Sequence, residues 1–319
     1  PDFIIIYRLS MLELVPEGLA WDEIVEQAKA IEAAGATIIN TGIGWHEARV
    51  PTIATSVPRA AFASVTAKMK PHVKLPLVAT NRINMPDVAE KILAEGQADM
   101  VSMARPLLAD PHWLNKAKAG QAHLINTCIA CNQACLDHVF ENKKASCLVN
   151  PRACRETELN YPAAQAKKRI AVVGAGPAGL SFATVAAGRG HQVTLFDAAD
   201  EIGGQFNYAK QIPGKEEFHE TIRYYTNLLA KHGVETRLGK AVTADHLKQS
   251  GFDEVVLATG ITPRGLRLPG SDNPKVLSYL DVLRDKKPVG NSVAIIGAGG
   301  IGFDVAEYLL HNQSSTLDV

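Results

Sequence analysis

The five cysteines of this 319-residue chain all lie between Cys128 and Cys154. Four of them follow the spacing C-x2-C-x3-C-x11-C, namely Cys128, Cys131, Cys135 and Cys147. A secreted disulfide scaffold spreads its cysteines over a small chain, so this local cluster indicates a metal or cofactor site. Four thiolates suit a [4Fe–4S] cluster or a structural zinc ion. Zinc sites usually show two separated C-x2-C pairs, so three close cysteines and a distant fourth favour the iron–sulfur cluster.

A glycine-rich turn follows the cysteines. The apolar segment 169–173 leads into Gly174, Gly176 and Gly179 in the pattern G-x-G-x-x-G, and an Ala-rich helical segment, 180–187, comes next. The following strand-like run, 193–196, ends in Asp197, 18 residues after the third glycine. Strand, turn, helix and acid at this spacing predict a dinucleotide site, with the pyrophosphate at the helix N-terminus and the ribose on the acid.

A second G-x-G-x-x-G is formed by Gly297, Gly299 and Gly302, between a predicted strand over 292–296 and a helical run over 303–310. Two dinucleotide folds in one polypeptide indicate a flavin and a nicotinamide that exchange a hydride. The sequence stops at Val319, before a residue that would read the 2′-phosphate, so the choice between NADPH and NADH stays open.

Residues 1–120 alternate strand-like and helical patterns, which predicts a parallel sheet covered by helices. We expect strands over 3–8, 37–42, 75–80 and 99–103, and helices over 21–34, 59–70 and 86–95. Polar residues follow the strands, where a (β/α)8 barrel carries its chemistry: Arg8, His46, Glu47, Arg49, Arg82 and Arg105. Four βα units are half of such a barrel, so the sheet is either open or lacks its first half.

The composition excludes several classes of protein. Lys and Arg number 33 against 33 Asp and Glu, which argues against a nucleic-acid or anionic-membrane binder. No apolar run approaches the roughly 20 residues of a membrane-spanning helix, and no secretory leader precedes the first strand, so we expect a cytoplasmic protein. The sequence begins at Pro1, inside a strand-like segment, and we expect it to be an internal piece of a longer protein.

The order of these motifs resembles one family. The stretch Gly42-Ile43-Gly44-Trp45-His46-Glu47, the cysteine spacing, Gly203-Gly204-Gln205 and Ala258-Thr259-Gly260 occur with the two glycine-rich turns as in bacterial NADPH-dependent 2,4-dienoyl-CoA reductases. These enzymes are related to trimethylamine dehydrogenase and the enoate reductases. The resemblance covers essentially the whole chain.

The resemblance implies an α/β chain with four parts. They are the C-terminal half of an FMN- and substrate-binding TIM barrel over 1–120, a [4Fe–4S] segment and linker over 121–165, part of a Rossmann-like FAD domain over 166–288, and the start of a Rossmann-like NADPH domain over 289–319. Electrons would pass from NADPH to FAD, through the cluster to FMN, and on to a 2,4-dienoyl-CoA in the β-oxidation of unsaturated fatty acids. The family also implies a monomer whose partners are NADPH and a fatty acyl-CoA.

Residue roles carry over by position. Arg8 corresponds to an arginine at the flavin, and Arg82, Ala104 and Arg105 to the FMN phosphate site. His46 corresponds to the catalytic histidine, and His46, Glu47, Ala48 and Arg49 to substrate contacts. The FAD contacts would be Gly174, Gly176, Ala178, Gly179, Asp197, Gln205, Val242, Thr259 and Gly260, and the NADPH contacts Gly297, Gly299 and Gly302. The family's catalytic tyrosine lies outside this sequence, and Cys154 has no matching role.

Two alternatives remain open at the sequence level. One is a related flavin and iron–sulfur enzyme, such as an enoate reductase or an amine dehydrogenase. The other is an electron-transfer flavin module that delivers electrons to a partner. A pure electron carrier has no need of His46, Arg49 and an FMN phosphate site, so residues 1–120 favour an enzyme.

Overall fold

The computed structural model describes residues 3–45 and 48–311, which form two compact units, one ending at Glu156 and one beginning at Thr157. Each unit contains a four-stranded parallel sheet with helices between the strands, which confirms the predicted α/β class. None of the helices in these described ranges is both long and apolar enough to cross a bilayer.

The sheet of the first unit has the strand order β1-β2-β3-β4. Every neighbouring pair is parallel, so a helical crossover joins each strand to the next. Its strands are β1 (Ile6–Leu12), β2 (Ile38–Ile43), β3 (Leu77–Ala79) and β4 (Met100–Val101). Its helices are α1 (Trp21–Ala33), α2 (Ala63–Met69), α3 (Pro86–Ala94), α4 (Arg105–Ala109) and α5 (Trp113–Lys118).

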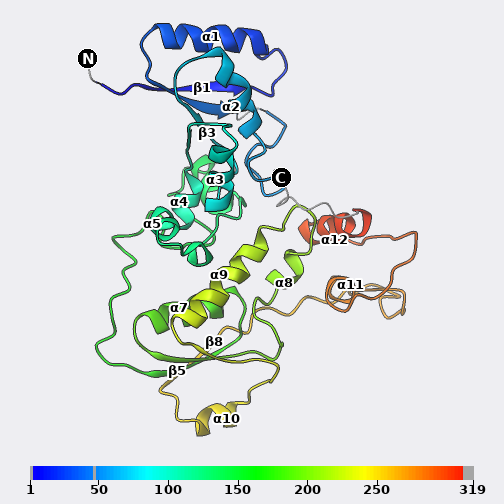
Figure 1. The fold of residues 1–319 in the computed structure, drawn as a ribbon. Helices are drawn as coiled ribbons and strands as arrows, with labels where there is room; N and C mark the ends of the chain where they lie inside the picture. Colours follow the sequence, from blue (N-terminus) through cyan, green and yellow to red (C-terminus); the bar gives the residue numbers. More distant parts are fainter. Residues whose placement is uncertain (1–2, 46–47, 312–319) are drawn as a thin grey trace. The chain divides into compact units, whose positions relative to one another are not determined.

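The two faces of this sheet differ in character. Leu9 and Met11 of β1 are buried on one face in a cluster with Ile24 and Ala28 of α1, and Figure 1 shows α1 lying along β1. Burial of side chains of this size is worth roughly 1.5–3 kcal/mol each. Alternate residues of a strand point to opposite sides, so the opposite face carries the polar residues Arg8 and Ser10 of β1. Arg8 is in register with Asn40.

The structure corrects the position of Arg8. The sequence predicted a strand over 3–8 with Arg8 just beyond it, but β1 runs from Ile6 to Leu12 and Arg8 is its third residue. The apolar run Phe3–Ile5 is exposed, whereas Leu9 and Met11 supply the buried face, so packing moves the strand toward the C-terminus. Arg8 therefore projects from the polar face of the sheet, several residues before the end of the strand.

The helix predicted over 59–70 is shorter than expected. Ala60 has φ +57°, a left-handed conformation that a right-handed helix cannot contain, and α2 begins at Ala63. At its other end α2 passes into the 3-10 turn Lys70–His72, where Pro71 provides no backbone N–H for a further helical hydrogen bond. The remaining elements of this unit for which bounds were predicted, including the shorter β4, lie within two residues of their predicted ends.

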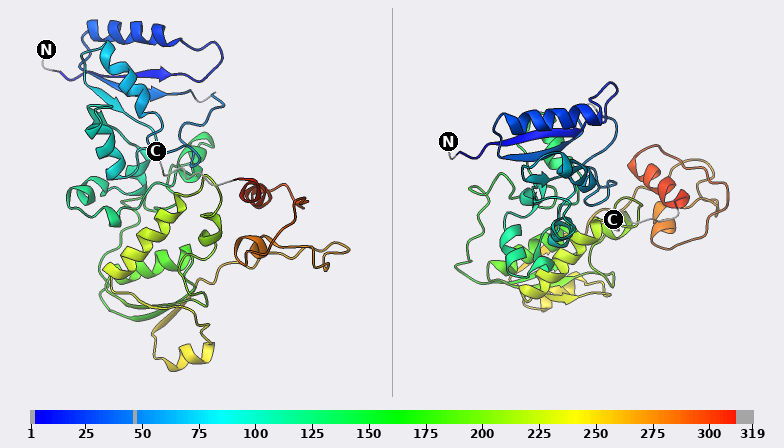
Figure 2. Two further views of the ribbon diagram at one scale, coloured as in Figure 1. Left: turned by 45° about the vertical axis from the view of Figure 1, so that its right-hand side comes forward. Right: turned by 45° about the horizontal axis from the view of Figure 1, so that its top comes forward.

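The sheet of the second unit has the order β7-β6-β5-β8, formed by β5 (Arg169–Val173), β6 (Gln192–Phe196), β7 (Glu235–Arg237) and β8 (Glu254–Leu257). Helices α7 (Pro177–Gly188) and α9 (Phe218–Lys231) pack on one face around Leu180, Leu195 and Leu229. On the other face His246 of α10 (Ala244–Gln249) makes an edge contact with Phe196. The left view of Figure 2 shows α10 and the pair α7 and α9 on opposite sides of the strands.

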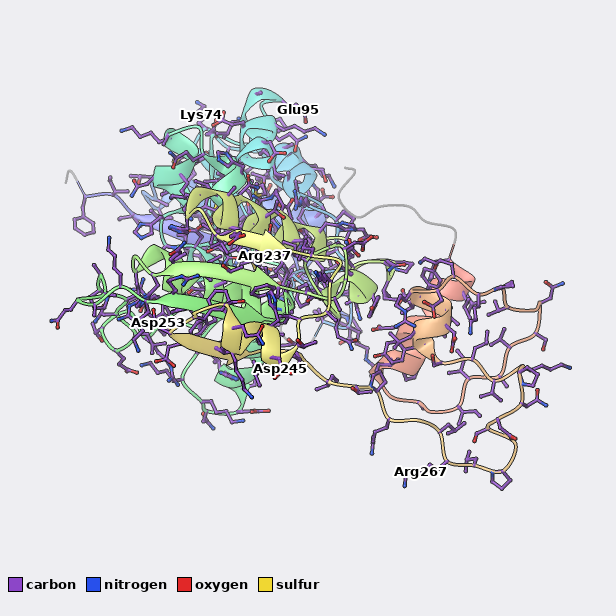
Figure 3. The ribbon with its side chains drawn as sticks, turned by 90° about the horizontal axis from the view of Figure 1, so that it is seen from below. Lys74, Glu95, Arg237, Asp245, Asp253 and Arg267 are labelled. Atoms are coloured by element: carbon purple, nitrogen blue, oxygen red, sulfur yellow. The ribbon has the colours of Figure 1, made fainter. Side chains whose placement is uncertain are left out.

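A smaller cluster holds the last part of the described chain. Ile212 packs with Leu283 of α11 (Tyr279–Leu283) and Val305 of α12 (Gly300–Leu310), next to the short helix α8 (Phe206–Ala209). Lys215 Nζ lies 2.6 and 2.7 Å from the two carboxylate oxygens of Asp304. Figure 3 shows Arg267 on the long connection that precedes α11 and α12, away from the strand that carries Arg237.

The strand predicted over 292–296 does not form, although α12 follows where a helix was expected. A parallel strand needs a neighbour to accept its backbone hydrogen bonds. No strand of the described chain pairs with this segment, and its residues are exposed.

Candidate functional site

Two arginines lie beyond the strands of the first sheet, at its carboxyl edge. Arg82, which follows β3, is 4% exposed, and its Nε donates to the carbonyl oxygen of Val57 at 2.7 Å. Arg105, the first residue of α4 after the N-cap Ala104, donates from Nη1 to the carbonyl oxygen of Ile53 at 2.9 Å. Both side chains thus hold the loop that follows β2, and they place two cations where parallel α/β folds bind phosphate.

The backbone after β3 is in an unusual conformation. Asn81 and Arg82 have φ values of +70° and +55°, two consecutive left-handed residues that each cost roughly 1–2 kcal/mol. Neighbouring contacts compensate: Ala60 N–H donates to the carbonyl oxygen of Arg82 at 3.0 Å, and Trp113 Nε1 donates to that of Asn84 at 2.9 Å. Strain of this kind gathers at ligand sites, where the surrounding structure maintains it.

Two buried hydroxyl groups in this unit have no hydrogen-bond partner among the described residues. They are Ser10 Oγ on β1 and Thr55 Oγ1 in the loop after β2. An unsatisfied buried hydroxyl costs roughly 1–3 kcal/mol, so a bound polar molecule would stabilise this region. Thr55 lies between Ile53 and Val57, the two residues that the arginines contact, and its hydroxyl is a donor that fits a phosphorylated ligand such as FMN. Sequence reasoning did not identify Ser10 or Thr55, because isolated hydroxyl residues form no motif.

The residues expected to contact substrate lie in the same loop. His46 and Glu47 are outside the described residues, so their predicted roles carry no structural account here. Ala48 donates its N–H to the carbonyl oxygen of Trp45 at 3.0 Å, and Arg49 is exposed. Arg49 is therefore available to an anionic substrate, although its predicted role stays a prediction.

Loop contacts connect the segments that carry the four predicted cluster cysteines. Asn84 Nδ2 donates to the carbonyl oxygen of Cys128 at 3.1 Å, which ties the first cysteine to the segment after β3. A π-helical turn, Gln133–Asp137, contains Cys135. Ser146 N–H donates to the carbonyl oxygen of Ala134 at 2.7 Å and so brings the fourth cysteine, Cys147, next to that turn.

Burial raises the pKa of three of these thiols. It raises the pKa of Cys147 to about 11 and also raises those of Cys131 and Cys128, and neighbouring cysteines add to each increase. The positive charges of Arg105 and Arg82 act in the opposite direction on Cys128. Cysteine thiols become thiolates when they bind iron or zinc, because the cation compensates their negative charge.

The metal centre itself is not shown. All five cysteines are free thiols, and no group of three or more His, Cys, Asp or Glu among the residues the structure describes is arranged to hold a metal ion. The chemistry of the donor set, four thiols in one loop region, still fits a cluster held by cysteine thiolates. Cys154 has a left-handed backbone (φ +61°) and lies outside the spacing pattern.

In the second unit, the first glycine-rich turn is closely packed against its surroundings. A Cβ on Gly174 would lie 2.2 Å from the carbonyl oxygen of Ala258, beyond β8, and one on Gly179 only 1.8 Å from that of Gly174. A Cβ on Gly204 would approach Gly176 Cα at 3.1 Å. With Pro177 and Ala178 opening α7, the turn leaves the helix N-terminus to a ligand, as a pyrophosphate site requires.

Asp197 connects the turn to the end of β6. Its Oδ2 accepts a hydrogen bond from Ala175 N–H at 2.6 Å, and Lys240 N–H donates to its backbone oxygen at 3.2 Å. The structure thus brings the turn, Asp197 and the segment leading to Val242 to one edge of the sheet, where Thr259 and Gly260 also follow β8. Gln205 Oε1 accepts a 3.1 Å hydrogen bond from the Tyr279 hydroxyl.

The second glycine-rich turn repeats the local geometry of the first. Gly297 has φ +109°, close to the +110° of Gly174, and a Cβ on Gly302 would lie 2.2 Å from the carbonyl oxygen of Gly297. Gly299 is the N-cap of α12. A Cβ on Gly297 would meet nothing within 4 Å, however, so this turn lacks the neighbouring strand that Gly174 has.

Two protein-family models match separate parts of the chain. Residues 1–123 match the NADH:flavin oxidoreductase / NADH oxidase family, and residues 168–316 match the pyridine nucleotide-disulphide oxidoreductases. The sequence is 41% identical to a metal reductase of Desulforamulus reducens over 99% of this chain and 48% of the relative. It is 33% identical to a cinnamate reductase of Clostridium sporogenes over 92% of this chain and 43% of the relative.

A solved 2-naphthoyl-CoA reductase in complex with 2-naphthoyl-CoA superposes with a TM-score of 0.92 at 37% identity, covering 95% of this chain and 46% of that one. The chain therefore spans about half the length of the relatives it matches.

Proposed function

We propose that the protein reduces a 2,4-dienoyl-CoA with electrons from NADPH, because residues 1–123 match the NADH:flavin oxidoreductase / NADH oxidase family and residues 168–316 match the pyridine nucleotide-disulphide oxidoreductases. One observation carries the proposal: a single chain contains Arg82 and Arg105 beyond the strands of the first sheet, the loop region with the four cysteines, and the first glycine-rich turn. The likeness to a naphthoyl-CoA reductase supports an acyl-CoA as substrate.

Each group of residues has a separate task in this proposal. Arg82 and Arg105 would bind the FMN phosphate, and Arg8, on the polar face of the first sheet, would stabilise negative charge on the flavin ring. Cys128, Cys131, Cys135 and Cys147 would hold a [4Fe–4S] cluster. The first glycine-rich turn and Asp197 would bind FAD, while Gly297, Gly299 and Gly302 would contribute to the NADPH site. Bound together, these cofactors would supply hydride transfer at the flavins and single-electron transfer between them.

Substrate binding falls to the loop after β2. Arg49 would attract the anionic acyl-CoA, and Glu47 and Ala48 would contact it beside His46. A histidine exchanges protons near neutral pH, so His46 would help to deliver the proton that completes reduction of the double bond.

A second candidate is electron delivery to an external acceptor, which the 41% identity to a metal reductase favours. Full-length protein purified without oxygen separates the two. Oxidation of NADPH that depends on a 2,4-dienoyl-CoA, in protein that contains both flavins and iron, would support the proposal. Turnover with Fe(III) but not with the dienoyl-CoA would favour the second candidate, and protein with zinc and no FMN would exclude the first.

A further inference from the structure

Arg105 joins two parts of the first unit that are distant in sequence. Its Nη1 donates to the carbonyl oxygen of Ile53 at 2.9 Å and to Oδ1 of Asn132 at 2.5 Å. Ile53 belongs to the loop after β2, and Asn132 follows Cys131 directly. One guanidinium group therefore fixes the proposed phosphate loop and the cysteine loop at the same time.

The contacts of Arg105 leave hydrogen-bond donors for a phosphate. The two contacts occupy the two hydrogens of Nη1, and they leave the Nε hydrogen and the two Nη2 hydrogens. This is the edge through which a guanidinium binds phosphate with two parallel hydrogen bonds. A phosphate on that edge would hold Arg105 in the orientation that its contact with Asn132 needs.

Asn132 is suited to its side of the contact. It has φ +61°, a left-handed conformation that Asn and Gly tolerate better than other residues. Its carbonyl oxygen accepts a 3.0 Å hydrogen bond from Asp137 N–H, closing the turn that contains Cys135. Fixing the Asn132 amide therefore fixes the backbone between Cys131 and Cys135.

We propose that Arg105 and Asn132 are positioning residues that link the flavin-phosphate site to the cysteine loop, so that FMN and the iron–sulfur cluster stabilise each other. The inference rests on the proposed function, since it needs both groups. A phosphate that orders Arg105 also orders Asn132 and the turn that contains Cys135. A cluster that orders this turn would in the same way order Asn132 and Arg105, and so favour phosphate binding. Such a linkage is reciprocal by thermodynamic necessity.

The test uses full-length protein, with FMN present or removed, under anaerobic conditions. An iron chelator is added, and the loss of the visible cluster absorption is timed. We expect removal of FMN to accelerate cluster loss about fivefold or more, the lower end of typical coupling between sites. Protein without the cluster should also bind FMN more weakly, as an increase in the equilibrium Kd.

Three variants isolate the link. Asn132→Asp keeps an acceptor for Arg105 and should retain the FMN dependence. Asn132→Gly keeps the left-handed backbone but removes the amide, so cluster loss should become equally fast with and without FMN. Asn142→Gly, the same substitution at another left-handed residue of the same segment (φ +55°), is the matched control and should behave as wild type.

The possible failures are distinguishable. Wild-type protein that contains iron and FMN but loses its cluster at one rate regardless of FMN would overturn the linkage and leave the proposed function intact. An unchanged FMN dependence in Asn132→Gly would also overturn it. Full-length protein without iron or FMN would overturn the proposed function and the linkage together.

Discussion

The carboxylate of Asp197 accepts a 2.6 Å hydrogen bond from the N–H of Ala175, inside the first glycine-rich turn. The residue predicted to bind ribose therefore also orders the turn that would bind the pyrophosphate. A second bond, from Ala199 N–H to Oδ1 at 2.8 Å, fixes the carboxylate from the other side. Nucleotide recognition and turn geometry depend on one side chain.

Substitution of Asp197 should therefore weaken FAD binding strongly. Hydrogen bonds to a charged group are worth roughly 1.5–3 kcal/mol, so Asp197→Ala should raise the Kd for FAD about 10- to 100-fold. Fluorescence titration of FAD-depleted full-length protein measures this. Asp200→Ala, at an exposed residue of the same loop, is the control and should leave the Kd unchanged. Equal Kd values for Asp197→Ala and wild type would contradict an FAD site at this turn.

Two glycines of α7 should respond differently to a methyl group. In Gly179→Ala the new Cβ would lie 1.8 Å from the carbonyl oxygen of Gly174, so the helix or the turn must move. We expect a loss of about 1–3 kcal/mol of stability and little bound FAD. In Gly188→Ala the nearest atom is a ring carbon of His232 at 3.5 Å, an ordinary contact. This variant should stay within about 1 kcal/mol of wild type and keep its FAD. Thermal unfolding and flavin absorbance report both effects, and similar behaviour of the two variants would contradict the described turn.

The cysteines should fall into two classes in an iron analysis. Full-length protein should contain about four irons in a cubane cluster, and Cys128→Ser, Cys131→Ser, Cys135→Ser and Cys147→Ser should each remove most of them. Cys154→Ser should retain wild-type iron, because Cys154 lies outside the spacing. Iron and zinc are measured by elemental analysis and the cluster by its visible absorption. Equal iron loss in Cys154→Ser would reassign the ligand set.

Asp99 should stabilise the first unit at neutral pH but not in acid. A 2.9 Å hydrogen bond from Leu77 N–H, followed by the contact of Lys70 Nζ at 2.8 Å, lowers the pKa of its carboxyl. This stabilisation is present above the unfolded pKa of about 3.9 and is lost as the pH falls through the lower, folded value.

Asp99→Asn should thus cost about 1 kcal/mol at pH 7, a modest value because water screens this exposed ion pair, and the difference from wild type should shrink toward pH 2. Thermal unfolding across this range, with exposed Glu90→Gln as control, tests the prediction. A difference that grows in acid would contradict it.

Local patterns in the sequence predicted a strand correctly where neighbouring strands are present to pair with it. β5 was predicted with its observed bounds, because the apolar run 169–173 has a strand on either side of it in the sheet. The similar run over 292–296 has no neighbouring strand in the part of the chain that the structure describes, and it forms no strand there. The edges of β1 also depend on tertiary packing, which favours Leu9 and Met11 over the equally apolar Phe3–Ile5.

The candidate site shows the same limit. The glycine-rich turns and the cysteine spacing are sequence-local and could be recognised directly. The contact between Arg105 and Asn132 spans 27 residues, and Thr55 is notable only because its buried hydroxyl has no hydrogen-bond partner in residues 3–45 and 48–311. Such relationships arise from the fold, so neither has a signature in the sequence.

The close approach of Gly174 to Ala258 has a consequence for synthesis of the chain. The first nucleotide turn packs against the carbonyl group of a residue 84 positions further along the chain. The strand β8, which supports this turn, pairs with β5 from Ile170 to Val173. During translation the turn is synthesised early, but its binding geometry is complete only after residue 258 has left the ribosome. FAD should therefore be captured late, after most of the second unit has emerged, and a nascent chain that ends before β8 should not retain it.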